Sequence, residues 1–138
     1  MVLEPIHPRP PQHAMPFVPG LKVRNAGTLL FVSGATANPL YHTHPHDPAE
    51  LTPPDDIREQ TRRVMDNLKL VLDAAGATFQ DVVKITKFLT RMDEQDAVWS
   101  VMQPYFGAHL PTSTTVEVSR LVVPGLRLEV EVIAALPD

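Results

Sequence analysis

The stretch PTSTTVEVSRLVVPGLRLEVEVIA, residues 111–134, decides the fold class of this chain. β-Branched residues dominate both of its halves, and Pro124-Gly125 separates them, which predicts two β-strands joined by a turn. In the second half, aliphatic residues alternate with the charged residues Arg127, Glu129 and Glu131. Because successive side chains of a strand point to opposite faces, this strand has one apolar and one charged face. The apolar face needs a covering layer, most simply helices.

Two helical segments can form that layer. Residues 54–75 carry apolar side chains at three- and four-residue spacing, with Thr52 as a suitable N-cap and Gly76 as a suitable C-terminal residue. Residues 93–106 form the second expected helix, which Pro104 shortens or kinks. Both helices can lie on the same face of one sheet, and we expect that arrangement.

The remaining strands precede and separate these helices. Residues 21–25 and 28–33 predict a hairpin, and the continuous apolar run 29–32 predicts a strand that is buried on both faces. Residues 81–92 predict a central strand. Residues 1–15 are rich in proline, which has no backbone donor, so we expect an extended arm with at most a short edge strand. The predicted order is ββαβαββ, an α+β single domain over residues 1–138.

A sheet with both helices on one face leaves its other face open. If simple alternation sets the register, that open face carries Arg127, Glu129, Glu131, Ser113, Thr115 and Glu117. Closed association of several subunits would cover this face and create clefts between neighbouring subunits. The periodicity of the sequence does not distinguish a dimer from a trimer.

Composition excludes or disfavours several functional classes. The chain has 138 residues and no cysteine, which excludes disulfides, thiolate nucleophiles and cysteine metal sites. Its net charge of −4 and its lack of a basic run argue against nucleic-acid partners. It has no apolar stretch long enough to span a membrane, and residues 1–11 contain no signal-peptide core. We therefore expect a cytoplasmic protein without a membrane partner.

Three alternating histidines, His42, His44 and His46, stand in the irregular segment 35–52 and are followed by Asp47. An extended segment could place three imidazoles on one side, and zinc accepts several imidazole ligands. The alternative is a stiff, solvated loop whose histidines are merely polar, and no further ligand stands at motif spacing. We favour the loop and expect no metal.

Several ordered segments of the chain match one known family. They are PFVPG at 16–20, FVSG at 31–34, EQTRRVMDNLKLVLDAAG at 59–76, DVVKITKFLTRMDE at 81–94, PYF at 104–106, VEVSRL at 116–121 and LEVEVIA at 128–134. From about Pro16 to Ala134 the chain resembles the RidA family, also called YjgF or endoribonuclease L-PSP. The resemblance implies a chorismate-mutase-like fold and a homotrimer whose sheets form an inner barrel, with a small-molecule pocket at each subunit interface.

The resemblance also implies a chemistry. Family members with deaminase activity hydrolyse reactive imines and enamines to a keto acid and ammonia, without a cofactor, a metal or a covalent nucleophile. Glu129 matches the family glutamate that positions the attacking water, and Ser33 and Gly34 match a backbone segment that lines the pocket. The alternative role for Glu129 is an ion pair or hydrogen-bond network between subunits.

The chain departs from the family pattern at the substrate anchor. Ser113 stands where the family has an arginine, and a hydroxyl cannot replace the two charge-assisted hydrogen bonds of a guanidinium. Phe17 stands at a family tyrosine position, and Trp99 stands at a family asparagine position. Together with Thr114 and Thr115, these residues predict a more apolar and more neutral pocket.

Three functional hypotheses remain. The first is an imine or enamine hydrolase that acts on a substrate other than the usual small 2-imino acids, with Glu129 as the water-orienting base. The second is a non-catalytic trimer that binds a small metabolite in the same clefts. The third is standard deamination of 2-iminobutanoate and 2-iminopropanoate, which the missing arginine disfavours.

Overall fold

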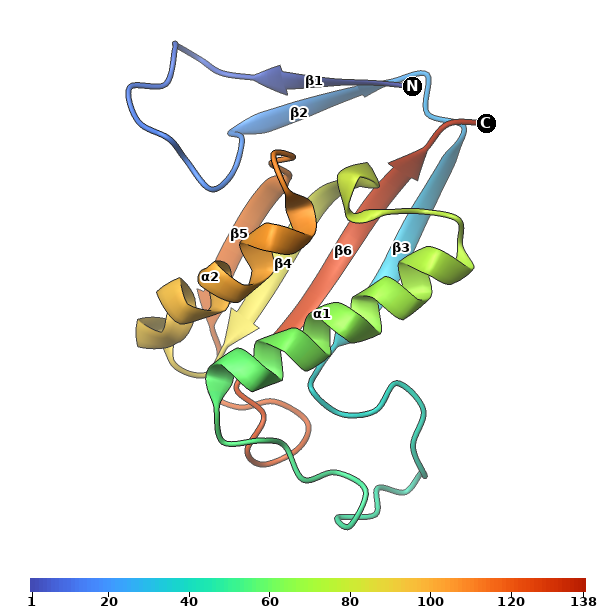
Figure 1. Cartoon of the computed structure of the whole chain (residues 1–138), viewed down its shortest axis with the longest axis vertical. Coiled ribbons are helices and arrows are strands. Elements are labelled where there is room, and N and C mark those ends of the chain that lie inside the picture. The colour runs from blue at the N-terminus through green and yellow to red at the C-terminus, as the bar shows by residue number, and fades with distance from the viewer.

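The computed structural model describes residues 1–138, and its two helices lie on one face of a sheet (Figure 1). The elements follow in the order β1 (Val2–Ile6), β2 (Gly20–Arg24), β3 (Thr28–Ala35), α1 (Ile57–Ala74), β4 (Val82–Leu89), α2 (Gln95–Phe106), β5 (Thr112–Glu117) and β6 (Leu128–Leu136). Short 3₁₀ turns at Phe79–Asp81 and Met92–Glu94 precede β4 and α2. Apart from the additional β1, this is the predicted ββαβαββ order, and the α+β prediction is confirmed.

The main sheet has the strand order β3-β6-β4-β5, which corrects the prediction of a hairpin over residues 111–134. β5 and β6 do not pair with each other, because β4 lies between them (Figure 1). β4 runs parallel to β5 and antiparallel to β6. The connection after β5 therefore has to cross the end of β4 before β6 can begin. Pro124-Gly125 belongs to that long connection and does not form a tight hairpin turn.

The predicted hairpin near the N-terminus is also wrong. β2 pairs with β1 in a separate two-stranded sheet, and β3 pairs with β6. Local turn residues indicate that a chain reverses, but the partner of each strand depends on contacts made far along the sequence. The proline-rich arm accordingly contributes a strand, in which Pro5 lies opposite Leu21 on an edge that tolerates a missing donor.

Helix α1 begins at Ile57 and not at residue 54, as the sequence predicted. Its N-cap is Asp56, whose carboxylate accepts a hydrogen bond of 2.9 Å from the backbone N–H of Arg58. This cap sets the later start, because Asp56 is in an extended conformation and the residues before it therefore lie outside the helix. At the other end, Gly76 has a φ of +73°, the left-handed conformation expected just after a helix.

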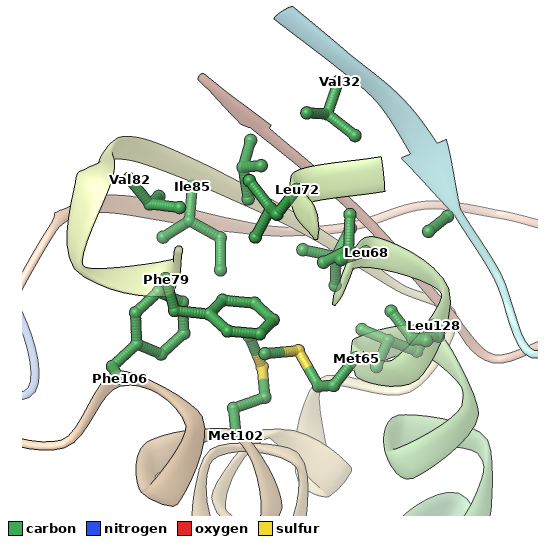
Figure 2. Close-up of a cluster of buried hydrophobic side chains, with 14 of the residues drawn as sticks. Val32, Met65, Leu68, Leu72, Phe79, Val82, Ile85, Met102, Phe106 and Leu128 are labelled. Carbon is green, nitrogen blue, oxygen red and sulfur yellow. The ribbon is translucent and has the colours of Figure 1, made fainter. Parts of the chain in front are cut away.

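The core lies between the helices and the main sheet (Figure 2). Met65 and Leu68 of α1 meet Met102 and Phe106 of α2, and all four side chains are fully buried. The rings of Phe79 and Phe106 are 5.3 Å apart in an edge-to-face arrangement. From the sheet, β6 contributes Leu128, Val130, Val132 and Ala134. This packing buries one face of each strand of the main sheet and leaves the opposite face available for a site or a partner.

The opposite face of the sheet is uncovered in the single chain. Leu29 and Phe31 lie on it with 57% and 70% of their surface exposed, so the prediction that the 29–32 run is buried on both faces does not hold within one chain. They pair with Ala135 and Ile133 of β6, which shows that the uncovered face is partly apolar. None of the helices is both long and apolar enough to cross a membrane.

Candidate functional site

Glu129 lies on the uncovered face of the sheet, as the alternation in β6 predicted. It stands opposite Phe88 of β4 and is half-buried. Its carboxylate packs directly against the backbone of Gly34, where an added Cβ would come within 2.6 Å of Oε2. Ser33 and Gly34 occupy the irregularity between Val32 and Ala35 where β3 leaves register with β6. The structure therefore brings Glu129, Ser33 and Gly34 together. Residue 34 has to be glycine, because the carboxylate of Glu129 lies where a side chain would begin.

The environment of Glu129 favours its protonated form. Burial is the first cause and the neighbouring carboxylate of Glu131 is the second, and both raise the pKa of Glu129 above its ordinary value of 4.5. Glu129 takes part in none of the ion pairs within the chain. A half-buried carboxylate of raised pKa without an internal partner is suited to accepting and returning a proton.

A second group of expected site residues surrounds a cavity of about 350 Å³. Phe17 comes from the arm between β1 and β2, Trp99 from α2, and Ser113 and Thr115 from the edge strand β5. The volume lies within the range of about 300–1,000 Å³ that is usual for small-molecule sites. Of the residues predicted for one pocket, Phe17, Trp99, Ser113 and Thr115 line this cavity.

This cavity is on the helix side of the sheet, which corrects the predicted position of Ser113, Thr115 and Glu117 on the uncovered face. Ser113 pairs with the core residue Ile85, and Thr115 pairs with Lys87. Paired residues of adjacent strands share a face, so these side chains point toward α2. The expectation was wrong because it counted alternation across a hairpin, whereas β4 sets the register of β5.

Thr114 points the other way and lies on the uncovered face. Its hydroxyl oxygen accepts a hydrogen bond of 2.6 Å from Nζ of Lys84, which lies on β4 two residues before Thr86, the direct partner of Thr114. Thr114 therefore does not line the same cavity as Thr115. In the single chain, the expected site is divided between the two faces of the sheet.

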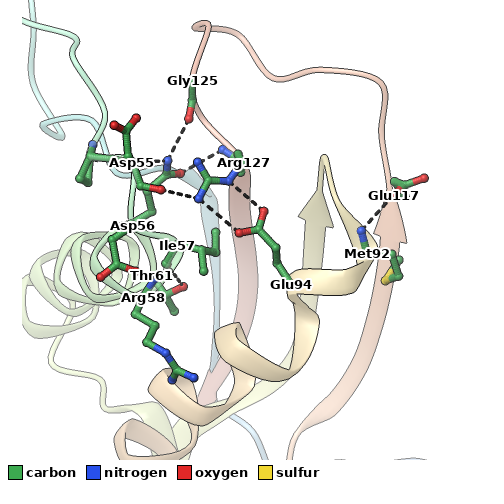
Figure 3. A network of polar contacts seen from close by, with 12 residues as sticks. Asp55, Asp56, Ile57, Arg58, Thr61, Met92, Glu94, Glu117, Gly125 and Arg127 are labelled. Atoms are coloured by element: carbon green, nitrogen blue, oxygen red, sulfur yellow. Dashed lines mark hydrogen bonds and ion pairs between the residues drawn. The ribbon is translucent and has the colours of Figure 1, made fainter.

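Arg127 is likewise not on the uncovered face, contrary to the prediction. Its guanidinium forms an ion pair with Glu94, with Nε 2.8 Å from Oε1, and it also donates to the backbone carbonyl of Asp55 (Figure 3). Both charged side chains are more than four-fifths buried. Its backbone N–H donates to Oε1 of the buried Gln60 at 3.0 Å. Arg127 ties the connection before β6 to the start of α1.

Lys87 is the cavity residue that the sequence reasoning missed. It stands between Ile85 and Leu89 on the helix-facing side of β4, where both neighbours belong to the core. Its Nζ lies 5.4 Å from the ring centroid of Trp99, and burial lowers the pKa of the ammonium. The available signal was a lysine at a core position of the KITKFL run, a charge that interrupts an otherwise apolar face.

The three histidines of the 36–56 loop gather in space. The possible ligand atoms of His42, His44 and His46 all lie within 4.8 Å of one another, and their ring centroids are 4.7–5.2 Å apart. Nδ1 of His42 is 2.9 Å from the carbonyl oxygen of Pro39, which makes Nδ1 the protonated nitrogen and leaves Nε2 free. This is the one group in the chain with a geometry that could hold a metal ion.

A larger cavity, of about 850 Å³, lies at the connection between β5 and β6. Its lining includes Arg91, Arg120 and Arg127 but none of the residues expected at the site. It is wide open to solvent, and its lining is mostly loop backbone and exposed side chains. We therefore give weight to the smaller cavity, where aromatic, hydroxyl and ammonium groups converge.

Comparison with known proteins identifies the family. A family model described as endoribonuclease L-PSP matches residues 8–136. The chain belongs to this family. RidA/YjgF is another name for it, so the resemblance inferred from the motifs is confirmed. The chain is 37% identical over 121 residues to a RutC family protein of Pyrococcus horikoshii, which covers 86% of this chain and 88% of that protein.

Two further members of the RidA/YjgF family bear on fold and function. TdcF of Escherichia coli, which its name describes as a candidate reactive intermediate deaminase, is 30% identical over 129 residues, or 91% of each chain. The Rid family protein YyfB of Yersinia pestis, a protein of unknown function, has a crystal structure with a TM-score of 0.81 and 27% identity. That match covers 99% of this chain and all of YyfB, which shows that the whole chain adopts the YjgF-type fold.

Proposed function

We propose that this chain is a RidA-type hydrolase of imines or enamines that works as a homotrimer, with one site at each subunit interface. The observation that carries the proposal is the division of the site. Glu129 and Gly34 lie on the uncovered face, whereas Phe17, Trp99 and Ser113 line a cavity on the other side, at the edge strand. A second copy of the chain that packs its uncovered face near this edge would complete one cleft from two halves.

The uncovered face supports this assembly. Leu29 and Phe31 are exposed there, and Val116 of the edge strand is 37% exposed on the same face. Neighbouring exposed apolar side chains of this size favour association. Each Å² of apolar surface that an interface removes from water stabilises the assembly by about 25 cal/mol. A closed ring of three copies would leave no such face exposed.

The chemistry follows from a base next to a bound imine. Water adds to the carbon of the protonated imine while one of its protons passes to Glu129, which forms an amino alcohol. Glu129 then returns this proton to the nitrogen. The C–N bond breaks as the hydroxyl gives its proton back to the carboxylate, and ammonia leaves together with the carbonyl product. The raised pKa of Glu129 suits both directions of this transfer. TdcF, with its name as a candidate reactive intermediate deaminase, supports the same reaction class.

The position of the family arginine offers no carboxylate clamp in this chain, which favours substrates other than the small 2-imino acids. Ser113 offers one neutral donor where family members have an arginine, and the rings of Phe17 and Trp99 supply apolar surface. The same replacement favours the alternative hypothesis, a trimer that binds a metabolite without turnover. Saturable binding of an imine without ammonia release would support that alternative and contradict the hydrolase.

Replacing Glu129 by glutamine tests the mechanism. An amide cannot accept the proton of water, so we expect the rate to fall about 100- to 10,000-fold, the usual contribution of general acid–base catalysis. Ammonia release would be measured on a panel of imines generated in situ by an amine oxidase or an amino-acid oxidase. In the wild type the rate should also fall as the pH drops through the raised pKa of Glu129, because protonation removes the base.

The matched control is Glu131→Gln, which changes the neighbouring carboxylate on the same face. It should retain activity, and it should shift the acid limb to lower pH, because Glu131 raises the pKa of Glu129. Light scattering would check that both variants keep the oligomeric state of the wild type. Equal turnover by wild type and Glu129→Gln would exclude the proposed role of this carboxylate.

A further inference from the structure

Lys87 is an ammonium group held in the candidate cavity without a negative partner. It belongs to none of the ion pairs of the chain. Two carboxylates on neighbouring elements are engaged elsewhere: Glu94 pairs with Arg127, and Glu117 accepts the backbone N–H of Met92 at 2.9 Å. Asp96 also lines the cavity, but it belongs to none of the ion pairs of the chain.

The burial of the Lys87 ammonium without a negative partner costs free energy. A cation loses hydration on burial, and the contact with the Trp99 ring returns only part of that loss. The lowered pKa of Lys87 has the same cause. An anion that enters the cavity would restore the lost electrostatic interaction, in a region where water screens it less than at the surface.

We propose that Lys87 is the anchor for the carboxylate of a small ligand that binds in this cavity. The hydroxyls of Ser113 and Thr115 are the neutral donors beside it, and the rings of Phe17 and Trp99 flank the apolar body of the ligand. One ammonium and two hydroxyls suit a singly charged carboxylate better than a phosphate, which calls for more positive charge. The ligand class is therefore a monocarboxylate with a planar or aliphatic body.

The anchor comes from a different strand than Ser113. Lys87 stands on β4 opposite Thr115, two residues beyond the level of Ser113 along the sheet. An acid held from this position is oriented differently from one held at residue 113. This inference rests on the cleft of the proposed function but not on its chemistry, since an anion anchor serves a hydrolase and a binding protein alike.

Trp99 provides a direct measurement, because it is the single tryptophan of the chain and lies beside Lys87. Benzoate and hexanoate would be titrated while Trp99 fluorescence is recorded, with benzamide as the uncharged counterpart of benzoate. We expect at least one of the two acids to bind saturably, and benzamide to bind about ten- to a hundredfold more weakly than benzoate, the difference expected for a hydrogen bond to a charged group.

The variants isolate the charge. Lys87→Met keeps the length of the side chain and should weaken binding of the acid by about the same ten- to a hundredfold. Lys87→Arg keeps the charge and should retain most of the affinity. Lys69→Met, at an exposed lysine of α1, should bind like the wild type. Three results would each contradict the proposal that Lys87 anchors a carboxylate. They are equal binding of benzoate and benzamide, full affinity for the acid in Lys87→Met, and no saturable response to either acid.

The outcomes separate this inference from the proposed function. Acid binding that depends on Lys87, together with no turnover of any imine, would contradict the hydrolase and leave the anchor in place. Imine turnover together with acid binding that is unchanged in Lys87→Met would contradict only the proposal that Lys87 anchors the carboxylate. The two proposals can therefore fail independently.

The histidine cluster carries a second, independent inference. The geometry points to a divalent transition-metal site formed by His42, His44 and His46, with an open position for solvent. Zinc bonds to imidazole at about 2.0–2.1 Å, so ligand atoms already within 4.8 Å of one another need only small side-chain rotations to converge. The Nδ1–H of His42 donates to the Pro39 carbonyl, the outer contact that commonly orients a metal-bound imidazole.

The loop around these histidines is fixed by its own hydrogen bonds. Glu50 accepts from both the backbone N–H and the hydroxyl of Thr43, at 2.8 and 2.7 Å. These two bonds hold the carboxylate of Glu50 at Thr43, the residue between His42 and His44. A preformed loop with a negative neighbour favours a bound cation.

Calorimetric titration of the chain with Zn²⁺ and Ni²⁺ tests this site. We expect one ion per chain, with an affinity that falls at least tenfold in His44→Ala. His13→Ala, at an exposed histidine outside the cluster, is the control and should bind like the wild type. Unchanged affinity in His44→Ala, the same loss in His13→Ala, or no binding would overturn the site.

Discussion

Replacement of Phe106 by alanine is expected to reduce the free energy of unfolding by about 3–5 kcal/mol, the usual cost of removing a buried aromatic ring. Phe106 is fully buried, and it packs edge-to-face on Phe79 at the centre of the core (Figure 2). Its loss would leave a cavity between α2 and the sheet that rigid elements on both sides cannot close. Guanidinium titration monitored by circular dichroism would measure the change.

The control is Tyr41→Ala, which removes an aromatic side chain that is 90% exposed. It should change the free energy of unfolding by no more than about 0.5 kcal/mol, as surface substitutions usually do. All proteins must be compared at one concentration, because association stabilises the folded state by mass action. Similar losses in both variants would contradict the assignment of Phe106 to the core.

Gln60→Leu is expected to cost about 2–4 kcal/mol, although leucine has a similar size and is more apolar. The side chain of Gln60 is fully buried in α1, and its Nε2 donates to the carbonyls of Pro54 and Gly125 at 2.8 Å each. Its Oε1 accepts the backbone N–H of Arg127. Leucine would leave three backbone groups without partners, and each buried unpaired group costs about 1–3 kcal/mol.

Gln103→Leu is the matched control, since Gln103 is exposed and makes a single hydrogen bond to the carbonyl of Gly107. It should be close to neutral. Hydrogen exchange gives a second measurement: the amide of Arg127 should lose protection in Gln60→Leu and keep it in the control. A stable Gln60→Leu variant with a protected Arg127 amide would show that this network does not hold the connection before β6.

The elements themselves could be predicted because each depends on local chemistry. Alternation identified β6, the spacing of apolar residues identified α1, and Gly76 marked where the helix ends. The error at the start of α1 was also local, since Asp56 caps the helix through the backbone N–H of Arg58. Family motifs were readable for the same reason, being short runs of defined residues at defined spacing.

Strand partners and faces could not be predicted in this way. Alternation shows which residues of one strand share a face. Whether a given set of residues in β5 lies on the same face as a set in β6 depends on β4, which lies between them. As a result, Ser113 and Thr115 were assigned to the wrong face, while Glu129 was assigned correctly. A single chain divides the expected site residues between the two faces of the sheet.

The sequence by itself therefore determined the fold class, the family and the residues around which a site could form. Only the tertiary structure decided that Lys87 enters the cavity beside Ser113, that Arg127 is held by Glu94, and that Glu129 faces Gly34. The physical reason is that helix and strand periodicity comes from backbone geometry within a few residues. A side chain's neighbours, and with them its charge state and chemistry, come from contacts between segments far apart in the chain.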